Sequence, residues 1–336
     1  MATIRDLAKY TGFSAATISR VLNNDATMKV MDSTRIAILE AADELKYSLP
    51  VSRRAKQQST YHVAIAEMMS QKGKMDDPYY LYLKNYVVRA CMEQGCMVSY
   101  LSAIDGRYQT MENKSVDGIL AIGIFSEEQI AQMTKISRAI IFVDSSPEEQ
   151  QFGSVVLNFK QGVELALNYL IQKGHRKIGF LGPTYKLDQK KRPALEVRRQ
   201  YFKEYMMQAG HYDERWMIDT MLTLEETKMQ VEKWVKSGKE RPTAFLAYNE
   251  GTAITAVGIF QDAGILIPQE LSVISFNDTP LAIFIDPPLT SINAHLETMG
   301  QEAVRLIKER MEKPEGLPYK VVLPLTLTER SSVSNC

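Results

Sequence analysis

Residues 11–24 read TGFSAATISRVLNN, and this stretch decides how the start of the chain folds. Ser14 is a good helix N-cap because its hydroxyl can accept a hydrogen bond from a free backbone N–H of the first turn. Ile18, Val21 and Leu22 recur at spacings of three and four, which predicts a helix with one buried face. The opposite face then carries four small or polar residues: Ala15, Ala16, Ser19 and Arg20.

The residues on either side predict two more short helices. Thr3 can cap a helix that has apolar Ile4, Leu7 and Ala8 on one side and that stops at Gly12. A third helix, beginning near Asp32 or Ser33, buries four apolar residues: Ile38, Ala41, Ala42 and Leu45. Three short helices with a glycine-bearing turn between the first two form a helix-turn-helix module.

The outward face of the second helix suits the DNA major groove. Small residues at the N-terminal end of a recognition helix allow it to approach base edges closely, in a groove about 12 Å wide. Ala15 and Ala16 can meet thymine methyl groups, and Arg20 suits a guanine edge or a phosphate. Three hydroxyls can bind phosphates or bases, those of Ser14, Thr17 and Ser19. The alternative interpretation is a three-helix bundle that packs on the rest of the chain.

The net charge of zero hides an asymmetry along the 336 residues. Residues 1–58 hold nine Lys or Arg against six Asp or Glu, a net charge of +3, so the remainder carries −3. Arg53, Arg54 and Lys56 gather the positive charge at one end of this segment. Clustered positive charge beside a helix-turn-helix is typical of a phosphate-binding surface.

Several classes of protein are disfavoured by what the sequence lacks. No run of about 18 apolar residues and no signal peptide is seen, so a cytoplasmic protein without a membrane partner is expected. Cys91, Cys96 and Cys336 match neither a zinc nor a redox motif, and we expect reduced cysteines, no metal and no cofactor. There is no HExxH, GxSxG or P-loop motif, and "GPTYK" at residues 182–186 is interpreted as a loop. An enzyme is therefore not expected.

From residue 61 onward, apolar strands alternate with amphipathic helices. The predicted strands are 61–68, 97–102, 116–123, 139–144, 154–159, 176–182, 243–249 and 271–278. The predicted helices are 79–94, 127–135, 160–173, 195–209, 225–237, 251–263 and 297–312. This alternation predicts an α/β fold with parallel, doubly wound sheets, and about 275 residues fit two of them.

Ligands of open α/β sheets bind beyond the carboxyl ends of the strands. That rule nominates five polar residues: Asp144, Asn249, Glu250, Asn277 and Asp278. Amides and carboxylates suit a sugar, because each hydroxyl both donates and accepts hydrogen bonds. Four aromatic residues are candidates to stack on its C–H surface: Tyr79, Tyr80, Phe276 and Phe284.

The first sixty residues resemble a known family. TIRDLAKYTGFSAATISRVLNN, followed by TRIAILEAADELKY, is similar to the DNA-binding headpiece of the lactose-repressor (LacI/GalR) family of bacterial transcription regulators. The resemblance implies that the second helix lies in the major groove, where Ala15, Ala16 and Arg20 read bases. It also implies a second group of residues that contact or orient on the DNA backbone: Thr3, Ser14, Thr17, Asn23 and Tyr47.

The hinge after the headpiece departs from the family pattern. The family usually has Ala-Arg-x-Leu here, with a leucine that wedges into the minor groove and kinks the DNA. This chain has Ser52-Arg53-Arg54-Ala55. Arg53 and Arg54 can still hold phosphates or enter the minor groove, but Ala55 is a poor wedge, so we expect a weaker kink.

The resemblance continues to the end of the chain and implies a periplasmic-binding-protein-like domain, whose two subdomains close around a ligand. The matched effector positions are Tyr79, Tyr80, Asp144, Leu157, Arg198, Asn249 and Asn277, beside the stacking candidate Phe276. Asn277 stands where Asp is common, Tyr201 where Gly is usual and Ala294 where the lactose repressor has Gln. DPYY and SFND are most similar to the evolved-β-galactosidase repressor branch, so galactose or a galactoside is the expected effector.

The expected organisation is a headpiece at 1–46, a hinge at 47–60 and an effector-binding and dimerisation domain at 61–336. Its N-subdomain covers about 61–157 and 293–320, and its C-subdomain about 158–292 and 321–332. The expected function is repression of a sugar-utilisation operon by a homodimer on double-stranded, pseudo-palindromic operator DNA, relieved by a sugar. No leucine heptad follows Arg330, so a dimer is expected. The alternative is a catabolite-control regulator driven by a phosphorylated carrier protein.

Overall fold

The computed structural model describes residues 2–23, 30–45, 47, 61–68, 77–104, 107–110, 115–189 and 191–336. It contains two compact units. Unit 1 comprises Met1–Val156, Gln189–Lys191 and His295–Leu323, and unit 2 comprises Leu157–Asp188, Arg192–Ala294 and Pro324–Cys336. Apart from the short loop at residues 189–191, the chain therefore passes between the units after Val156, Ala294 and Leu323.

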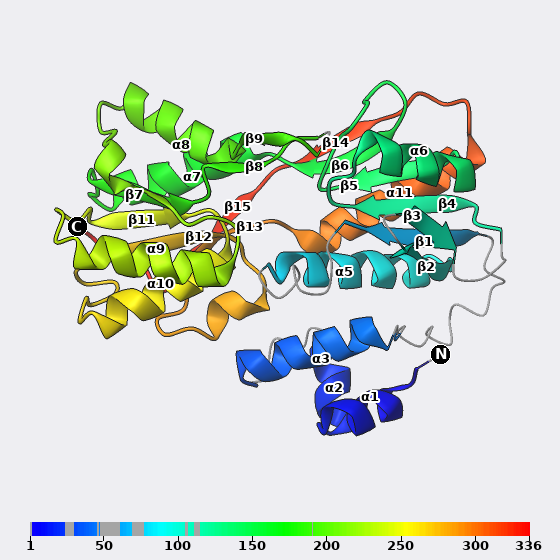
Figure 1. The fold of residues 1–336 in the computed structure, drawn as a ribbon, viewed down its shortest axis with the longest axis horizontal. Helices are drawn as coiled ribbons and strands as arrows, with labels where there is room; N and C mark the ends of the chain where they lie inside the picture. The colour runs from blue at the N-terminus through cyan, green and yellow to red at the C-terminus, as the bar shows by residue number, and fades with distance from the viewer. Residues whose placement is uncertain are drawn as a thin grey trace. The chain divides into compact units, whose positions relative to one another are not determined.

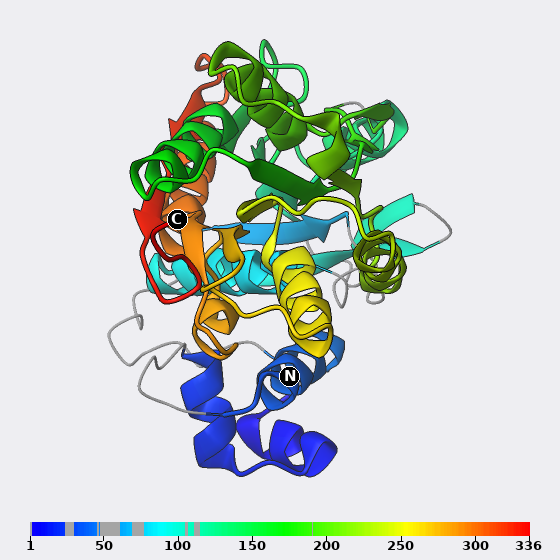
Figure 2. The same ribbon diagram turned by 90° about the vertical axis from the view of Figure 1, so that its left-hand side faces the viewer.

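Three short helices begin the chain, as the sequence predicts: α1 (Ile4–Thr11), α2 (Ala15–Leu22) and α3 (Asp32–Glu44). Each helix contacts the other two, and Figure 2 shows them in blue, crossing one another. Their shared core includes Leu7, Ile18 and Ile38, each with no exposed side-chain surface. Gly12 ends α1 in the left-handed conformation, with φ 76°, where glycine avoids the strain that a Cβ atom introduces.

Unit 1 is built on a seven-stranded sheet in the order β14-β6-β5-β4-β1-β2-β3 (Figure 1). Its strands are β1 (His62–Glu67), β2 (Met97–Ile104), β3 (Arg107–Thr110), β4 (Gly118–Ile122), β5 (Ile140–Val143), β6 (Gly153–Leu157) and β14 (Lys320–Leu323). The pairs β2–β1, β1–β4, β4–β5 and β5–β6 are parallel, whereas β3 runs antiparallel to β2. Three helices accompany the sheet: α5 (Tyr79–Glu93), α6 (Glu127–Ile136) and α11 (Leu296–Glu312).

Unit 2 has a six-stranded sheet in the order β10-β7-β11-β12-β13-β15. Its strands are β7 (Ile178–Gly182), β10 (Met217–Asp219), β11 (Ala244–Ala247), β12 (Ser272–Asn277), β13 (Thr290–Asn293) and β15 (Thr326–Thr328). Only the β13–β15 pair is antiparallel. Figure 1 shows α7 (Phe159–Gln172) and α8 (Val197–Gln208) on one face, and α9 (Leu224–Lys236) and α10 (Glu250–Asp262) on the other. Two 3-10 turns complete the unit, η2 (Glu214–Trp216) and η3 (Pro280–Ile283).

Helices cover both faces of the unit 2 sheet, so its central strands are buried in the core of the unit. The central strand β12 is buried along its whole length, as expected for a parallel strand enclosed on both sides. Phe245, on β11, stacks on Phe260, on α10, with ring centroids 5.7 Å apart. The predicted doubly wound architecture is therefore confirmed.

One prediction is wrong. The residues interpreted as a loop, 182–186, contain the start of β8 (Tyr185–Leu187), which pairs antiparallel with β9 (Pro193–Leu195) in a separate two-stranded sheet. The apolar residues of this hairpin pair across the strands, Tyr185 with Leu195 and Leu187 with Pro193. Three-residue strands show barely one full alternation, so their pattern is hard to tell from a loop.

Candidate functional site

The outward face of α2 is presented as the sequence predicts. The Ser14 hydroxyl caps the helix by accepting a hydrogen bond from the Thr17 backbone N–H at 3.1 Å, and it lies 2.8 Å from the Thr17 hydroxyl. Ala15, Ala16 and Arg20 are exposed, while Ile18, Val21 and Leu22 are buried. The helix therefore offers two small residues and an arginine on one accessible face.

Other predicted DNA contacts already hold the headpiece together. Thr3 and Asp6 form a capping box, in which the Thr3 backbone N–H donates to the Asp6 carboxylate at 2.8 Å. Hydrogen bonds from Thr3 lower the pKa of Asp6. The Asn23 amide donates to the Ser19 carbonyl at 2.7 Å at the end of α2, and the side chain of Tyr47 is buried. Arg53, Arg54 and Ala55, named for the hinge, lie outside the described residues.

In unit 1, two tyrosines converge on Asp144. Tyr79 and Tyr80 open α5, and their hydroxyls donate to the two carboxylate oxygens of Asp144 at 3.0 and 2.8 Å. Asp144 follows β5 with φ 69°, a left-handed conformation that aspartate tolerates better than most residues. Burial, followed by the charge of Asp144, raises the pKa of Tyr80, so this phenol stays a proton donor. The cluster offers carboxylate and phenol groups to a polyol.

In unit 2, Arg198 is the centre of an aromatic cluster. It stands in the first turn of α8 with 4% of its surface exposed, and its Nε donates to Glu196 at 2.7 Å. Three rings surround the guanidinium carbon: Phe159 at 4.6 Å, Tyr248 at 4.9 Å and Phe276 at 5.6 Å from ring centroid to carbon. We refer to Glu196, Arg198 and these three rings as the Arg198 cluster.

Two amides at the strand ends of unit 2 differ in what they already bind. Asn249 caps α10, and its Oδ1 accepts from the Thr252 backbone N–H at 2.9 Å, so a ligand would meet its Nδ2 group. Asn277 ends β12 with φ 98°, and its backbone carbonyl accepts from the Ala294 N–H at 3.2 Å.

Leu157, the remaining predicted effector residue of unit 2, lies at the end of β6, and its side chain is buried.

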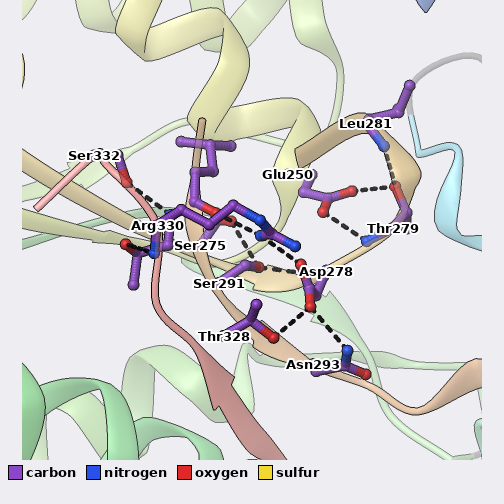
Figure 3. A network of polar contacts seen from close by, with 12 residues as sticks. Glu250, Ser275, Asp278, Thr279, Leu281, Ser291, Asn293, Thr328, Arg330 and Ser332 are labelled. Carbon is purple, nitrogen blue, oxygen red and sulfur yellow. Dashed lines mark hydrogen bonds and ion pairs between the residues drawn. The ribbon is translucent and has the colours of Figure 1, made fainter. Parts of the chain in front are cut away.

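Two carboxylates nominated by the strand-end rule are occupied within unit 2. The Asp278 Oδ2 accepts from Asn293 at 2.8 Å and from Thr328 at 2.6 Å, and its Oδ1 lies 2.6 Å from Arg330 Nη1 (Figure 3). Glu250 accepts from the Thr279 backbone N–H at 2.7 Å and from the Thr279 hydroxyl. Both carboxylates join distant segments of unit 2, which is a structural role.

Other reactive groups of the described residues have structural surroundings. Cys91 and Cys96 are buried free thiols, and Cys336 is exposed. No group of three His, Cys, Asp or Glu among the described residues is placed to hold a metal ion. Nor is any described helix long and apolar enough to cross a membrane.

The comparisons with known proteins decide the family. Residues 3–49 match the model of bacterial regulatory proteins of the lacI family, and residues 167–333 match a periplasmic binding protein-like domain. The HTH-type transcriptional regulator GalR of Streptococcus thermophilus is 32% identical over 333 residues, covering 99% of each chain. The chain belongs to the lacI family. It is accordingly a DNA-binding transcriptional repressor of this family and not an enzyme.

Solved structures of transcription regulators share the fold along nearly the whole chain. The transcriptional regulator CelR in complex with cellobiose covers 99% of this chain at 22% identity, with a TM-score of 0.66. The lac repressor dimer bound to operator and an anti-inducer covers 99% at 19% identity, with a TM-score of 0.63. The first of these binds a sugar and the second binds operator DNA as a dimer.

The structure adds residues that the sequence reasoning did not single out. Phe159 lies two residues after Leu157, and Tyr248 lies directly before Asn249, so both are close to positions named from the sequence. A search within two residues of Leu157 and Asn249 would have found both. Glu196 has no such signal. It is the N-cap of α8, but the predicted helix begins at residue 195 and so places Glu196 inside the helix.

Proposed function

We propose that this repressor controls a sugar-utilisation operon and that galactose or a galactoside is its inducer. The observation that supports this most is the Arg198 cluster, where a buried guanidinium stands among three rings. Guanidinium and amide donors suit sugar hydroxyls, and ring faces suit the C–H surface of a pyranose. Assignment to the evolved-β-galactosidase repressor branch rests on DPYY and SFND and belongs to this proposal.

The proposed effector residues fall in both units. In unit 2 they are Arg198, Asn249, Phe276, Asn277 and Leu157, and in unit 1 they are Tyr79, Tyr80 and Asp144. The Asp144 carboxylate accepts from two phenols, and a carboxylate oxygen can accept more than one hydrogen bond, including one from a sugar hydroxyl. Asn277 and Asn249 supply amides on unit 2. Unit 1 therefore contributes a carboxylate and two phenols to the proposed residues, and unit 2 contributes a guanidinium and two amides.

The proposed DNA contacts are those of α2 and its neighbours. Ala15, Ala16 and Arg20 read base edges, while Thr3, Ser14, Thr17, Ser19, Asn23 and Tyr47 contact or orient on phosphates. Arg53, Arg54 and Ala55 complete the proposal in the hinge. A homodimer carries two headpieces, so the proposed operator is a pseudo-palindrome with one half-site for each. Action on such DNA places the protein in the cytoplasm.

Selection of bound DNA from a random pool, repeated with galactose and with galactosides, tests the proposal. The expected result is enrichment of one pseudo-palindrome, which is lost when the inducing sugar is added. Enrichment that no sugar alters, but that requires a phosphorylated carrier protein, would favour the catabolite-control alternative and contradict sugar induction.

A further inference from the structure

Glu196 and Arg198 form a buried ion pair at the start of α8. Their side chains are 1% and 5% exposed, and the Arg198 Nε lies 2.7 Å from the Glu196 Oε1. The other Glu196 oxygen accepts from the Arg199 backbone N–H at 2.9 Å, which caps the helix. The N-terminus of a helix carries a positive partial charge, so an arginine in this turn needs a nearby anion. Glu196 therefore balances both the guanidinium and the helix end.

The balanced charge changes which ligands the cluster can accept. An arginine buried without a counter-ion would attract a carboxylate or phosphate strongly, because a buried charge is costly until it is paired. Here the pairing is internal, and ring faces cover the guanidinium from three sides. An anionic ligand would place a second negative charge beside Glu196 without adding a cation.

The neighbouring polar groups of unit 2 do not restore an attraction for anions. Asn249 and Asn277 are neutral amides at the ends of β11 and β12. The cation Arg330 is paired with Asp278 at 2.6 Å, and Arg199 donates to the Gly182 carbonyl at 2.9 Å. Each of these cations is thus engaged by an anion or by the backbone.

We propose that Glu196 is a specificity-determining residue, which makes the site select neutral sugars and reject sugar acids and sugar phosphates. The inference rests on the proposed function, because it assumes that Arg198 contacts the effector. Glu196 acts through Arg198: it fixes the guanidinium by its Nε and cancels its charge, leaving hydrogen bonds rather than net charge to recognise the ligand.

Calorimetric titration of the full-length protein with galactose, galacturonate and galactose 6-phosphate tests the proposal. The parent protein is expected to bind galactose at least tenfold more tightly than either anion. Glu196→Gln keeps the side-chain length and a cap acceptor but removes the charge, and it is expected to lower this preference at least tenfold. Glu196→Asp retains the charge and should restore most of the preference.

Glu250→Gln is the matched control, because it removes another buried carboxylate at the start of a helix of unit 2, bonded to Thr279 rather than to Arg198. It should keep the preference of the parent protein. A parent protein that prefers either anion, or an unchanged preference in Glu196→Gln, would overturn the inference and leave sugar induction standing. A parent protein whose operator binding responds to no sugar would overturn the proposed function, and this inference with it.

Discussion

Arg20 is the residue on which base reading by α2 is expected to depend most. It is exposed in the last turn of the helix, on the face opposite Ile18 and Val21, which are buried. Ala15 and Ala16 on the same face bring no polar group of their own to the bases, and Ser19 brings only a short hydroxyl. Sequence preference should therefore respond to Arg20 more than to any other side chain of this face.

The first prediction is that Arg20→Ala weakens binding to the selected operator by about 1–3 kcal/mol, roughly 5- to 150-fold, if Arg20 reads a base. Fluorescence anisotropy with the operator and with a variant at the contacted base pair measures this. Arg215→Ala removes an exposed arginine far from the headpiece in sequence, paired with Asp213, and should leave both affinities unchanged. Equal affinity and equal sequence preference in Arg20→Ala would rule out base reading by Arg20.

His175 gives a pH-dependent prediction at the same scale. It is 2% exposed between the Thr243 hydroxyl and the Ser334 carbonyl, and burial lowers its pKa from the usual 6.5. Below pH 6.5 the unfolded chain takes up a proton that the folded chain resists, so the free energy of unfolding should fall as the pH falls. Above pH 6.5 both states are neutral at this residue and its contribution to the pH dependence vanishes.

Thermal unfolding between pH 7.5 and 5.5 checks this prediction. His175→Gln should show a shallower loss of stability on acidification than the parent protein, even if it is less stable at pH 7.5. Identical slopes in the two proteins would show that His175 does not stay neutral in the fold.

At the scale of elements, the turn between α1 and α2 depends on Gly12. Its φ of 76° is left-handed, and a Cβ atom added there meets nothing within 4 Å, so the cost of a side chain is confined to the backbone. Gly12→Ala should therefore destabilise the headpiece by about 1 kcal/mol. Chemical denaturation, followed by a spectroscopic signal of the headpiece, measures this change in the free energy of unfolding. Gly258→Ala, at a helical position with open space around it, is the control. We expect Gly12→Ala to lose more stability than the control, and an equal or smaller loss would contradict backbone strain at Gly12.

Asp278 holds together three neighbouring strands of unit 2, β12, β13 and β15. Its carboxylate joins β12 to Asn293 of β13 and to Thr328 of β15, and it pairs with Arg330 (Figure 3). Asp278→Ala removes two hydrogen bonds and leaves the partly buried Arg330, whose side chain is 19% exposed, without its anion, which should cost about 3 kcal/mol. Thr328→Val removes one hydrogen bond and should cost about 1 kcal/mol. Denaturant unfolding of unit 2 measures the free energy of unfolding of both variants. We expect the larger loss in Asp278→Ala, and equal losses in the two variants would contradict this.

The elements also show how far the sequence leads. The helices of both units were predicted to within about two residues, because their periodicity runs over several turns and caps such as Ser14 and Asn249 are local. Strands of three residues, such as β10 and β15, carry too little alternation to be recognised. The hairpin of β8 and β9 was missed for the same reason.

The candidate site was predicted where position along a strand decides it, as for Asp144 and Asn277. The sequence could not separate these from Asp278 and Glu250, because the partners that occupy the latter two, Arg330 and Thr279, come from other segments. The partnership of Glu196 with Arg198 emerges only when the first turn of α8 is built. The position of a polar residue at a strand end could therefore be predicted from the sequence, whereas its partners from distant segments could not.

At the scale of the whole molecule, repression and induction require two sites on one chain to be coupled. The chain passes between the units after Val156, Ala294 and Leu323, and the headpiece precedes all three passages. The headpiece belongs to unit 1 and Arg198 to unit 2, so these connections link the two proposed sites along the chain. Such couplings amount to 1–3 kcal/mol, or about 5- to 150-fold in affinity.

The proposed coupling is tested by the affinity of the full-length protein for its selected operator, measured by anisotropy with and without saturating galactoside. We expect a 5- to 150-fold loss of affinity with the sugar, and no loss in Arg198→Lys, which keeps the charge but not the planar guanidinium. Operator affinity that is unchanged by every galactoside, or an equal loss of affinity in Arg198→Lys, would contradict it.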